Sequence, residues 1–454
     1  MSRAERSGDV VVVGAGLSGL RAARELAAAG VSVLVVEAQR RVGGRTYTVP
    51  LGDGLFVDHG GQWVSPGQER LPELAAALGV ELFPSWDAGL TVHWQHGRRT
   101  VAPGLFTEHA ESSTAALREA ATALVALADE LPPGRPWEAP RAAEWDARTF
   151  HAWLDERVDD PAARAALARS LEGVFGGGPG RTSLLAALAI VRSGAHEITR
   201  LVATGDLGPE RRFVGGAQQL SDRMAAELPE PVLLDAPVSA IGQDADGVEV
   251  AAGATTVRAR RAVISPAPAL SARIRYEPPL PAARDHLTQR MPMGWVIKAH
   301  CVYPERFWAR DGLSGKVVSD EGAVRATADN SPPSGTPGVL VAFIEGAQAR
   351  RLAPATHEER RAAVLADLAR YFGPAAAEPA GYHEWSWGDD PFTRGAYGGY
   401  LAPGVWTAYG PALRAPAGRL HWTGAETAPT WNGKLEGAVR AGELTAREVL
   451  SALR

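Results

Sequence analysis

Cysteine is almost absent from this sequence: one residue, Cys301, occurs among 454 positions, which excludes any disulfide within the chain. It lies in the apolar run 296–302, so we expect a buried core residue. Long apolar runs are also missing, since none approaches the roughly 18 residues that span a bilayer. The first six residues are polar and do not form a signal peptide. We therefore expect a soluble, cytoplasmic protein with no membrane partner.

An excess of either charge is missing as well. The chain has 47 Lys and Arg residues against 52 Asp and Glu, a net charge of −5, and nothing in this balance favours a nucleic-acid partner. Lysine is scarce and arginine abundant, which we attribute to coding bias rather than to function. No metal site is expected, because His93 and His96 have no third and fourth ligands nearby. The 45% apolar fraction is typical of a globular chain with two or three cores.

The first forty residues carry the clearest pattern. An apolar run from Asp9 to Val13 predicts a buried strand, a glycine-rich turn follows, a helix is expected over 20–29, and a second strand over 31–36 ends on Glu37. A G-x-G-x-x-G turn in this context indicates a dinucleotide site. The first glycine allows the tight turn, the second lets the backbone approach a pyrophosphate, and the third lets the helix pack closely. These are Gly14, Gly16 and Gly19, and Glu37 would bind ribose hydroxyls.

The stretch Arg40–Thr46 follows almost at once, and here the chain resembles the two-dinucleotide-binding-motif flavoproteins, and among them the flavin amine oxidases. The resemblance implies FAD as the cofactor, with Gly44 and Arg45 beside its pyrophosphate. An arginine suits that place because its guanidinium binds phosphate oxygens in a bidentate way. The same resemblance places the segment 56–63 close to the flavin ring, where Gly60 and Gly61 allow a close approach.

The C-terminal segment completes the resemblance. Glycine 424 and Glu426 are followed by Trp431 and a G-x-x-E-G-A-like stretch that begins a long helix ending at Leu453. In the family this helix directs its N-terminus at the flavin, where a helix dipole stabilises negative charge. The cofactor-binding residues that the resemblance implies are, in full, Gly14, Gly16, Gly19, Glu37, Ala38, Gly44, Arg45, Gly60, Gly61, Gln62, Trp63, Val238, Trp387, Gly424, Glu426 and Leu435.

The order of these motifs predicts an α/β fold of two interleaved parts. A Rossmann-like FAD-binding domain is expected from residues 1–83, 213–287 and 393–454. An α+β substrate-binding domain is expected from residues 84–212 and 288–392, and its first segment is largely helical. The resemblance covers nearly the whole chain and is weakest between residues 100 and 200.

Three residues are predicted to carry the chemistry. Lys298 ends an otherwise apolar strand, where a buried lysine is costly. In the family the equivalent lysine holds a water against flavin N5 and assists the reaction with oxygen. Tyr397 would form one wall of an aromatic pair around the amine, and Lys434 stands where the family usually has the second aromatic wall. The predicted substrate-binding residues are Trp63, Val202, Tyr397 and Lys434.

Two departures from the family refine this interpretation. Covalent members carry a cysteine at the position of Ala396, so the resemblance implies FAD bound non-covalently here. Amino-acid oxidases of the superfamily tend to have an arginine near Trp63, which argues against a simple α-amino acid as substrate.

The sequence therefore predicts an FAD-dependent amine oxidase. A neutral amine would lose a hydride to flavin N5, the imine would hydrolyse, and O2 would be reduced to H2O2. One alternative is a flavin-dependent desaturase or dehydrogenase that acts on a larger natural-product intermediate, as in secondary metabolism. Another is a non-catalytic flavin-binding protein, against which Lys298 argues. The sequence leaves the oligomeric state open, with a homodimer among the alternatives.

Overall fold

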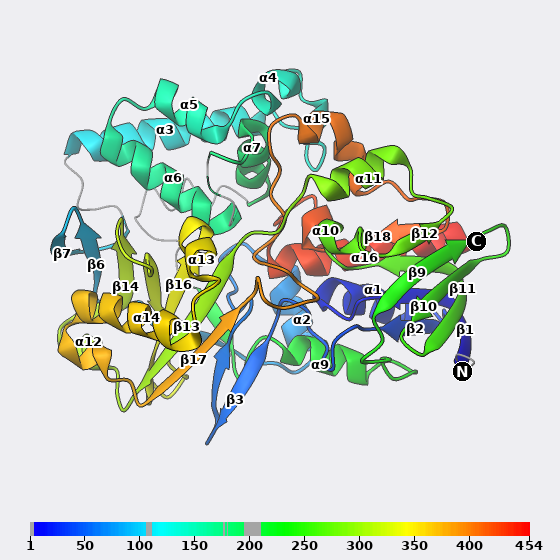
Figure 1. Cartoon of the computed structure of the whole chain (residues 1–454), viewed down its shortest axis with the longest axis horizontal. Helices are drawn as coiled ribbons and strands as arrows, with labels where there is room; N and C mark the ends of the chain where they lie inside the picture. The colour runs from blue at the N-terminus through cyan, green and yellow to red at the C-terminus, as the bar shows by residue number, and fades with distance from the viewer. Residues whose placement is uncertain (1–3, 106–110, 176–177, 179, 195–209) are drawn as a thin grey trace.

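The computed structural model describes residues 4–105, 111–175, 178, 180–194 and 210–454. Figure 1 shows two sheets side by side, with a group of helices along the upper edge of the molecule. The first sheet lies toward the two chain ends on the right, and the second lies on the left. The α/β fold expected from the sequence is confirmed.

The first sheet has the order β12–β9–β10–β11–β1–β2, and β18 also pairs with β11. Strand β1 lies parallel to both β2 and β11. Its apolar run has no alternation because both faces are covered: Val10 and Val12 pack toward α1 and α16, while Val11 and Val13 pack on the opposite side. The bounds are β1 Ala4–Val13, β2 Val33–Val36, β9 Val238–Gln243, β10 Val248–Ala252, β11 Thr255–Ile264, β12 Arg275–Glu277, β18 Leu420–Trp422, α1 Leu17–Ala28 and α16 Leu435–Leu453.

The second sheet has the order β17–β13–β16–β15–β14–β6–β7. Alternate residues of β13 face opposite sides: Ile297, Ala299 and Cys301 join the core against α14, whereas Lys298 and His300 point the other way. Cys301 is fully buried, as expected. The bounds are β6 Leu90–Gln95, β7 Arg98–Ala102, β13 Val296–Tyr303, β14 Leu313–Ser319, β15 Ala326–Asp329, β16 Gly338–Glu345, β17 Gly381–Ser386, α12 Phe307–Arg310, α13 Gly346–Leu352 and α14 His357–Phe372.

The helices along the upper edge share one apolar core, in which Trp145, Phe150 and Leu184 are almost completely buried. Thr149 and Ser183 cap α5 and α7 by accepting a backbone N–H in the first turn of each helix. The bounds are α3 Glu111–Asp129, α4 Ala142–Asp146, α5 Phe150–Arg157, α6 Pro161–Phe175, α7 Leu184–Ser193, α11 Ala282–Gln289 and α15 Val405–Tyr409.

Shorter elements connect these parts. The strand β5 pairs with β8, so that the two junctions between the sheets lie together. The bounds are β3 Thr48–Gly52, β4 Leu55–Asp58, β5 Leu82–Pro84, β8 Arg211–Phe213, α2 Arg70–Ala77, α9 Gln219–Ala226 and α10 Pro268–Ser271. Across the described ranges, no helix combines the length and apolar character that crossing a membrane requires.

Two local expectations were wrong. The first helix begins at Leu17 rather than Leu20, so Gly19 lies inside its first turn. Lys298 does not end its strand but is the third residue of β13, which continues to Tyr303 with backbone pairing on both sides. The strands of the two sheets fall within the two expected sets of segments, and the domain boundaries themselves stay a prediction.

Candidate active site

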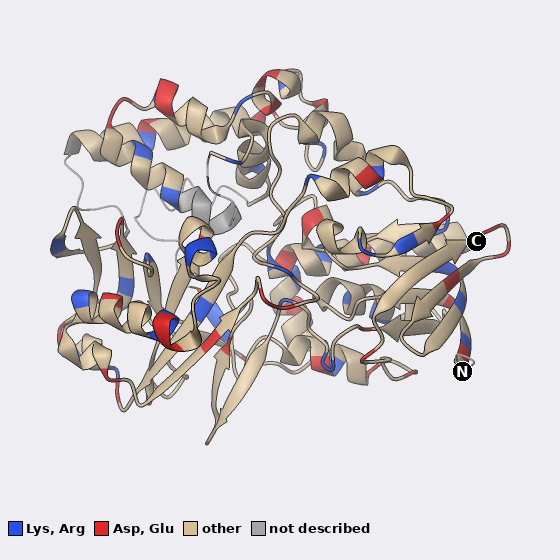
Figure 2. Cartoon of the chain, in the orientation of Figure 1, with Lys and Arg blue, Asp and Glu red and all other residues tan. Residues whose placement is uncertain are grey.

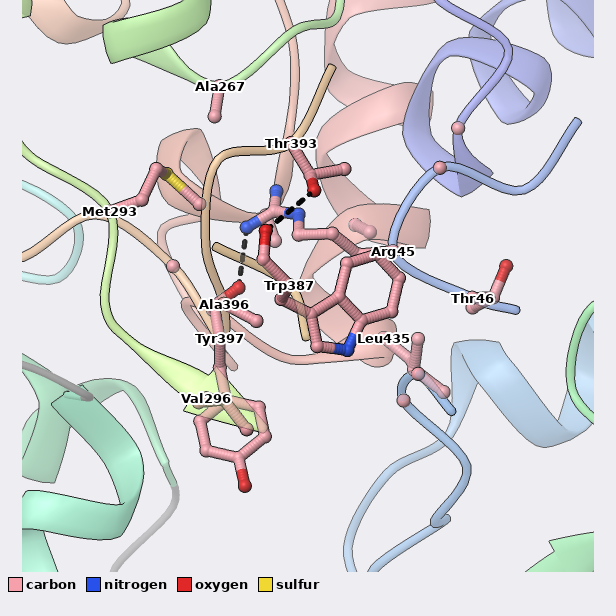
Figure 3. Close-up of a pocket in the computed structure, with 18 of the residues that line it drawn as sticks. Arg45, Thr46, Ala267, Met293, Val296, Trp387, Thr393, Ala396, Tyr397 and Leu435 are labelled. Atoms are coloured by element: carbon pink, nitrogen blue, oxygen red, sulfur yellow. Dashed lines mark hydrogen bonds between the residues drawn. The ribbon is translucent and has the colours of Figure 1, made fainter. Parts of the chain in front are cut away.

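A cavity of about 810 Å³ lies between the two sheets and is lined by both. Figure 3 shows one part of it, with Arg45, Trp387 and Tyr397 close together. Every predicted site residue within the described ranges lines this cavity except Gly19. Val202 lies outside the described residues. The fold therefore brings together predicted site residues that lie up to about four hundred positions apart in the sequence.

The glycine turn after β1 lies at one end of the cavity. Gly14 has a φ of 95°, a left-handed conformation that glycine adopts without strain. A Cβ atom at Gly19 would lie 2.1 Å from the carbonyl oxygen of Gly14, so only glycine fits beneath the turn. At Gly16, in contrast, a Cβ would meet no atom within 4 Å. The backbone of Gly16 thus faces open space at the N-terminus of α1, where an anion is favoured.

Glu37 holds this turn in place. Its carboxylate accepts the backbone N–H of Ala15 at 2.7 Å and that of Gln39 at 2.9 Å. Burial raises the pKa of Glu37, and these hydrogen bonds oppose the shift. Glu37 and Ala38 also line the cavity, which places Glu37 where ribose hydroxyls could reach it. The contact itself stays a prediction.

Arg45 and Glu426 form a bidentate ion pair inside the cavity. The Arg45 guanidinium donates to the two Glu426 oxygens at 2.6 and 2.9 Å and to the carbonyl oxygen of Tyr397 at 2.6 Å. Burial alone would raise the pKa of Glu426, but the charge of Arg45 outweighs it and lowers that pKa. This ion pair links the segment around Arg45 to the segment around Glu426, and both segments carry motifs of the family. The contacts of Arg45 and Glu426 with FAD stay predictions.

Lys298 reaches across from the second sheet to the turn after β4. Its ammonium donates to the Asp58 carbonyl oxygen at 2.6 Å, the Gly60 carbonyl oxygen at 2.9 Å and Gln62 Oε1 at 2.5 Å. Burial lowers the pKa of Lys298 to about 7, and the charge of Asp58 opposes this. Three oxygen acceptors also favour the ammonium, because a neutral amine has only two N–H donors. Lys298 therefore fixes the segment that carries Gly60 and Gly61.

Two buried histidine rings and an indole also surround Lys298. The ring of His300 lies 5.2 Å from that of His59, measured between centroids. Burial, with a further contribution from Lys298, lowers the pKa of His59 to about 3, so this ring is neutral near pH 7. The carbonyl oxygen of His59 accepts the indole N–H of Trp387 at 2.9 Å. The Lys298 ammonium also lies 5.2 Å from the centre of the Trp63 ring.

Tyr397 is anchored by a residue that the sequence analysis missed. Its hydroxyl donates to Glu345 Oε1 at 2.6 Å, and burial raises the pKa of Tyr397 well above its usual range. Glu345 ends the apolar strand β16 just as Glu37 follows β2, and that shared pattern was the available signal. Ala396, directly before Tyr397, is buried against the cavity.

Lys434 stands at the start of α16. It is the N-terminal cap position of this 19-residue helix, and its ammonium lies 5.5 Å from the centre of the Trp431 ring. Lys434 and Leu435 both line the cavity, so the helix N-terminus and its partial positive charge border that space.

The scarcity of lysine has a structural counterpart that the sequence analysis did not recognise. The whole chain contains three lysines, Lys298, Lys316 and Lys434. All three line this one cavity. The rarity of lysine in an arginine-rich chain was the signal that could have identified Lys316 as a residue of the cavity wall.

The observed residues fit FAD. The cavity offers open space at Gly16, a helix N-terminus beside it and the buried acid Glu37 at the same turn. A Cβ at Gly60 would lie 2.1 Å from the carbonyl oxygen of Arg45, so only glycine lets these two segments approach along the cavity wall. FAD bound here would be held by the glycine turn, by Glu37 and by the segments around Arg45 and Glu426.

Comparison with known proteins agrees with this geometry. The family model for flavin-containing amine oxidoreductases matches residues 17–450. An L-amino acid dehydrogenase of Synechocystis sp. is 37% identical, over 98% of this chain and 95% of its own. The structure of a putrescine oxidase bound to putrescine has a TM-score of 0.94 at 36% identity, covering 98% of this chain and 100% of the other.

Cyclohexylamine oxidase from Brevibacterium oxydans IH-35A has a TM-score of 0.92 at 35% identity, covering 99% of this chain and 100% of its own. Together these matches favour amine oxidation over the desaturase alternative. The chain therefore belongs to the flavin-containing amine oxidoreductases and is an FAD-dependent enzyme that oxidises the C–N bond of an amine.

Proposed function

We propose that this enzyme oxidises a neutral amine larger than a simple arylalkylamine and passes the electrons to O2, which yields H2O2. The observation that carries the proposal is that the glycine turn, Lys298, Tyr397 and Lys434 line one continuous cavity. Bound FAD supplies the hydride acceptor, and the protein supplies binding and orientation.

The roles proposed for the three chemical residues follow from their contacts. Tyr397 cannot easily swing away, because its hydroxyl is held by Glu345, and its ring offers one wall for the substrate. Lys298 places a buried positive charge at the turn that carries Gly60, where it would stabilise negative charge. Lys434 repels a protonated amine, which favours the neutral form that can lose a hydride.

The same residues suggest the size of the substrate. Two aromatic walls would favour a small arylalkylamine, but here an ammonium group takes the place of one wall. We expect poor turnover of benzylamine and phenethylamine. Better substrates should be larger and carry a hydrogen-bond acceptor for the lysine side chains, and they could belong to secondary metabolism.

The mode of FAD attachment should be non-covalent. Alanine occupies position 396, and the only cysteine of the chain, Cys301, is fully buried in the core on the other face of the second sheet. No cysteinyl bond to the flavin can form. Acid precipitation of the yellow protein should leave the flavin in the supernatant, whereas a yellow pellet would contradict this.

The proposed organisation keeps the domain boundaries given above. The two sheets use strands from the two predicted sets of segments, which supports the division. A cytoplasmic location and a homodimer are parts of the proposal that size-exclusion chromatography and localisation of the tagged protein would test.

A peroxide-coupled assay with a panel of amines tests the proposed reaction. We expect one H2O2 for each amine consumed, with larger polar amines preferred over benzylamine. A flavin that amines reduce but O2 does not reoxidise would contradict the role of oxygen. A clear preference for benzylamine would contradict the proposed substrate size.

A further inference from the structure

Three histidines connect the protein surface to the cavity, and the reaction described so far uses none of them. His300 lies in β13, and His383 is directly opposite it on the neighbouring strand β17. Directly opposed residues of antiparallel strands point to the same face of a sheet. His59 meets this face from the turn after β4, and its ring lies 5.2 Å from that of His300, measured between centroids.

The exposure of the three histidines changes along this row. His383 is half-buried on the edge strand of the second sheet, so part of this residue meets solvent. His300 is 0% exposed, and His59 is buried but lines the cavity. The row therefore begins at the protein surface and ends at the cavity wall, between the two backbone carbonyl groups that accept hydrogen bonds from Lys298.

Several nitrogen atoms in this row have no hydrogen-bond partner in the part of the chain that the structure describes. They are both ring nitrogens of His300, Nδ1 of His59 and the indole nitrogen of Trp385, whose ring lies 6.1 Å from that of His59. Buried polar groups in native proteins are nearly always hydrogen-bonded, either to protein or to ordered water. This cluster of buried nitrogens therefore indicates sites for ordered water molecules between the rings.

The surroundings keep the inner rings neutral. Burial lowers the pKa of His59 to about 3 and that of His300 well below its usual range, and the charge of Lys298 adds to both shifts. Arg212, on β8, and His383 lower the pKa of His300 further. A neutral imidazole has one N–H donor and one acceptor nitrogen. It can accept a proton on one nitrogen and release another from the opposite nitrogen, whereas a cationic ring would retain its proton.

The reaction with O2 requires a proton at the end of this row. Reduction of O2 to H2O2 takes two electrons and two protons. The hydride taken from the amine supplies two electrons and one proton, so one further proton must enter the cavity in each turnover. Positioned side chains commonly speed such proton transfers.

We propose that His383, His300 and His59, with ordered water between their rings, form a proton path from solvent to the cavity wall and deliver the second proton of H2O2. At each ring an N–H bond forms on one nitrogen while the N–H bond on the opposite nitrogen breaks, so the ring ends neutral. The last step forms an O–H bond on the reduced oxygen. The inference rests on the reduction of O2 proposed above, and His300 is a positioning residue remote from the reacting atoms.

Stopped-flow reoxidation of the reduced holoenzyme in H2O and D2O tests this path. His300→Leu interrupts it and should slow reoxidation by about 100-fold, the usual contribution of a positioned proton donor. The solvent deuterium isotope effect should also increase, because proton delivery becomes rate-limiting. His300→Gln can hydrogen-bond water but cannot relay a proton, so it should be equally slow. A wild-type rate in either variant, or a slow rate without the larger isotope effect, would overturn the proposal.

Two further variants separate proton delivery from structural damage. His59→Ala leaves a space at the cavity wall, so imidazole added to the buffer should restore much of the lost rate. A rate that imidazole does not restore would remove His59 from the path and overturn the proposal. His286→Gln is the control, since His286 is exposed on α11 and does not line the cavity. It should reoxidise at the wild-type rate. Reduction of the flavin by amine should be unchanged in every variant.

A measurement without turnover separates this inference from the oxygen reaction itself. In the oxidised holoenzyme with isotope-labelled histidine, NMR follows the exchange of the His300 ring N–H with water. His383→Leu should slow this exchange by about 10-fold or more, because it then depends on local opening of the sheet. Equal exchange in wild type and His383→Leu would overturn the path even if H2O2 is formed. Slower exchange would support the path even if O2 is not the acceptor.

Discussion

The two sides of the cavity are built differently. On the side of the first sheet, the polar groups are paired within the protein: Glu37 binds two backbone N–H groups, and Arg45 forms a bidentate pair with Glu426. On the side of the second sheet, the buried ammonium of Lys298 finds its acceptors on another part of the chain, about 240 residues earlier. One side is a cradle of a fixed shape, and the other carries a buried ammonium at the cavity wall. The first suits a constant cofactor, and the second suits selection among substrates.

The largest effect is expected where the cradle touches the cofactor. Gly16→Val should lower FAD affinity by at least about 100-fold, because the side chain would enter the space left for the pyrophosphate. The apoprotein should unfold at nearly the wild-type temperature, since a Cβ there meets no protein atom within 4 Å. FAD retention and thermal unfolding measure the two effects.

Gly180→Val is the matched control for that variant. Gly180 also has open space around a Cβ, but it does not line the cavity. This variant should keep wild-type FAD affinity. Normal FAD binding by Gly16→Val would show that the cofactor does not use the glycine turn.

Loss of the buried charge should have the next largest effect. Lys298→Met should slow reoxidation of the reduced flavin by O2 by about 10²–10³, the usual cost of removing one preorganised charge-stabilising group. It also removes the donor shared by Asp58, Gly60 and Gln62, so weaker FAD retention should accompany the change. Stopped-flow reoxidation at the wild-type rate would contradict the electrostatic role.

The pH dependence of reoxidation sharpens the same point. Burial lowers the pKa of Lys298 to about 7, so the ammonium predominates below that pH and is lost above it. The rate should be constant at lower pH and fall as the pH rises through about 7. In Lys298→Met this transition should be absent. A wild-type rate that instead rises through neutral pH would assign the effect to a different group.

A smaller effect is expected at the substrate wall. Tyr397→Phe removes the hydroxyl that donates to Glu345 and should lower the free energy of unfolding by about 1 kcal/mol. KM should rise modestly, because the ring loses its anchor, while FAD binding should be unchanged. Calorimetric unfolding and steady-state kinetics measure both. Loss of FAD from this variant would mean that Tyr397 supports the cofactor side of the cavity.

The contrast between the two sides also explains what the sequence could reveal. The glycine turn, the helix behind it and Glu37 lie within about thirty residues, so local spacing predicted their arrangement. Lys298 was recognised from the sequence as a costly residue in an apolar strand. Its predicted position at the end of that strand was wrong, because this polar residue interrupts the apolar pattern of β13 without ending the strand.

The remaining site residues depend on tertiary structure. Glu345 meets Tyr397 only because β16 and the turn around residue 397 converge on the cavity. Lys316 gave no local signal, since one lysine in a short strand is ordinary. Its meaning appeared only when the fold showed all three lysines in one place. The scarcity attributed to coding bias thus has a structural counterpart in where the three lysines lie.

A crystal structure of the FAD-bound enzyme tests the central claim, that a shape-fitting cradle and an electrostatic substrate wall share one cavity, most directly. The account predicts the pyrophosphate over Gly14 and Gly16, and the isoalloxazine ring between the segment 60–63 and Tyr397, with Lys298, Lys316 and Lys434 around the space left for substrate. A flavin ring that lies away from Tyr397, or that fills the space beside Lys316, would contradict it.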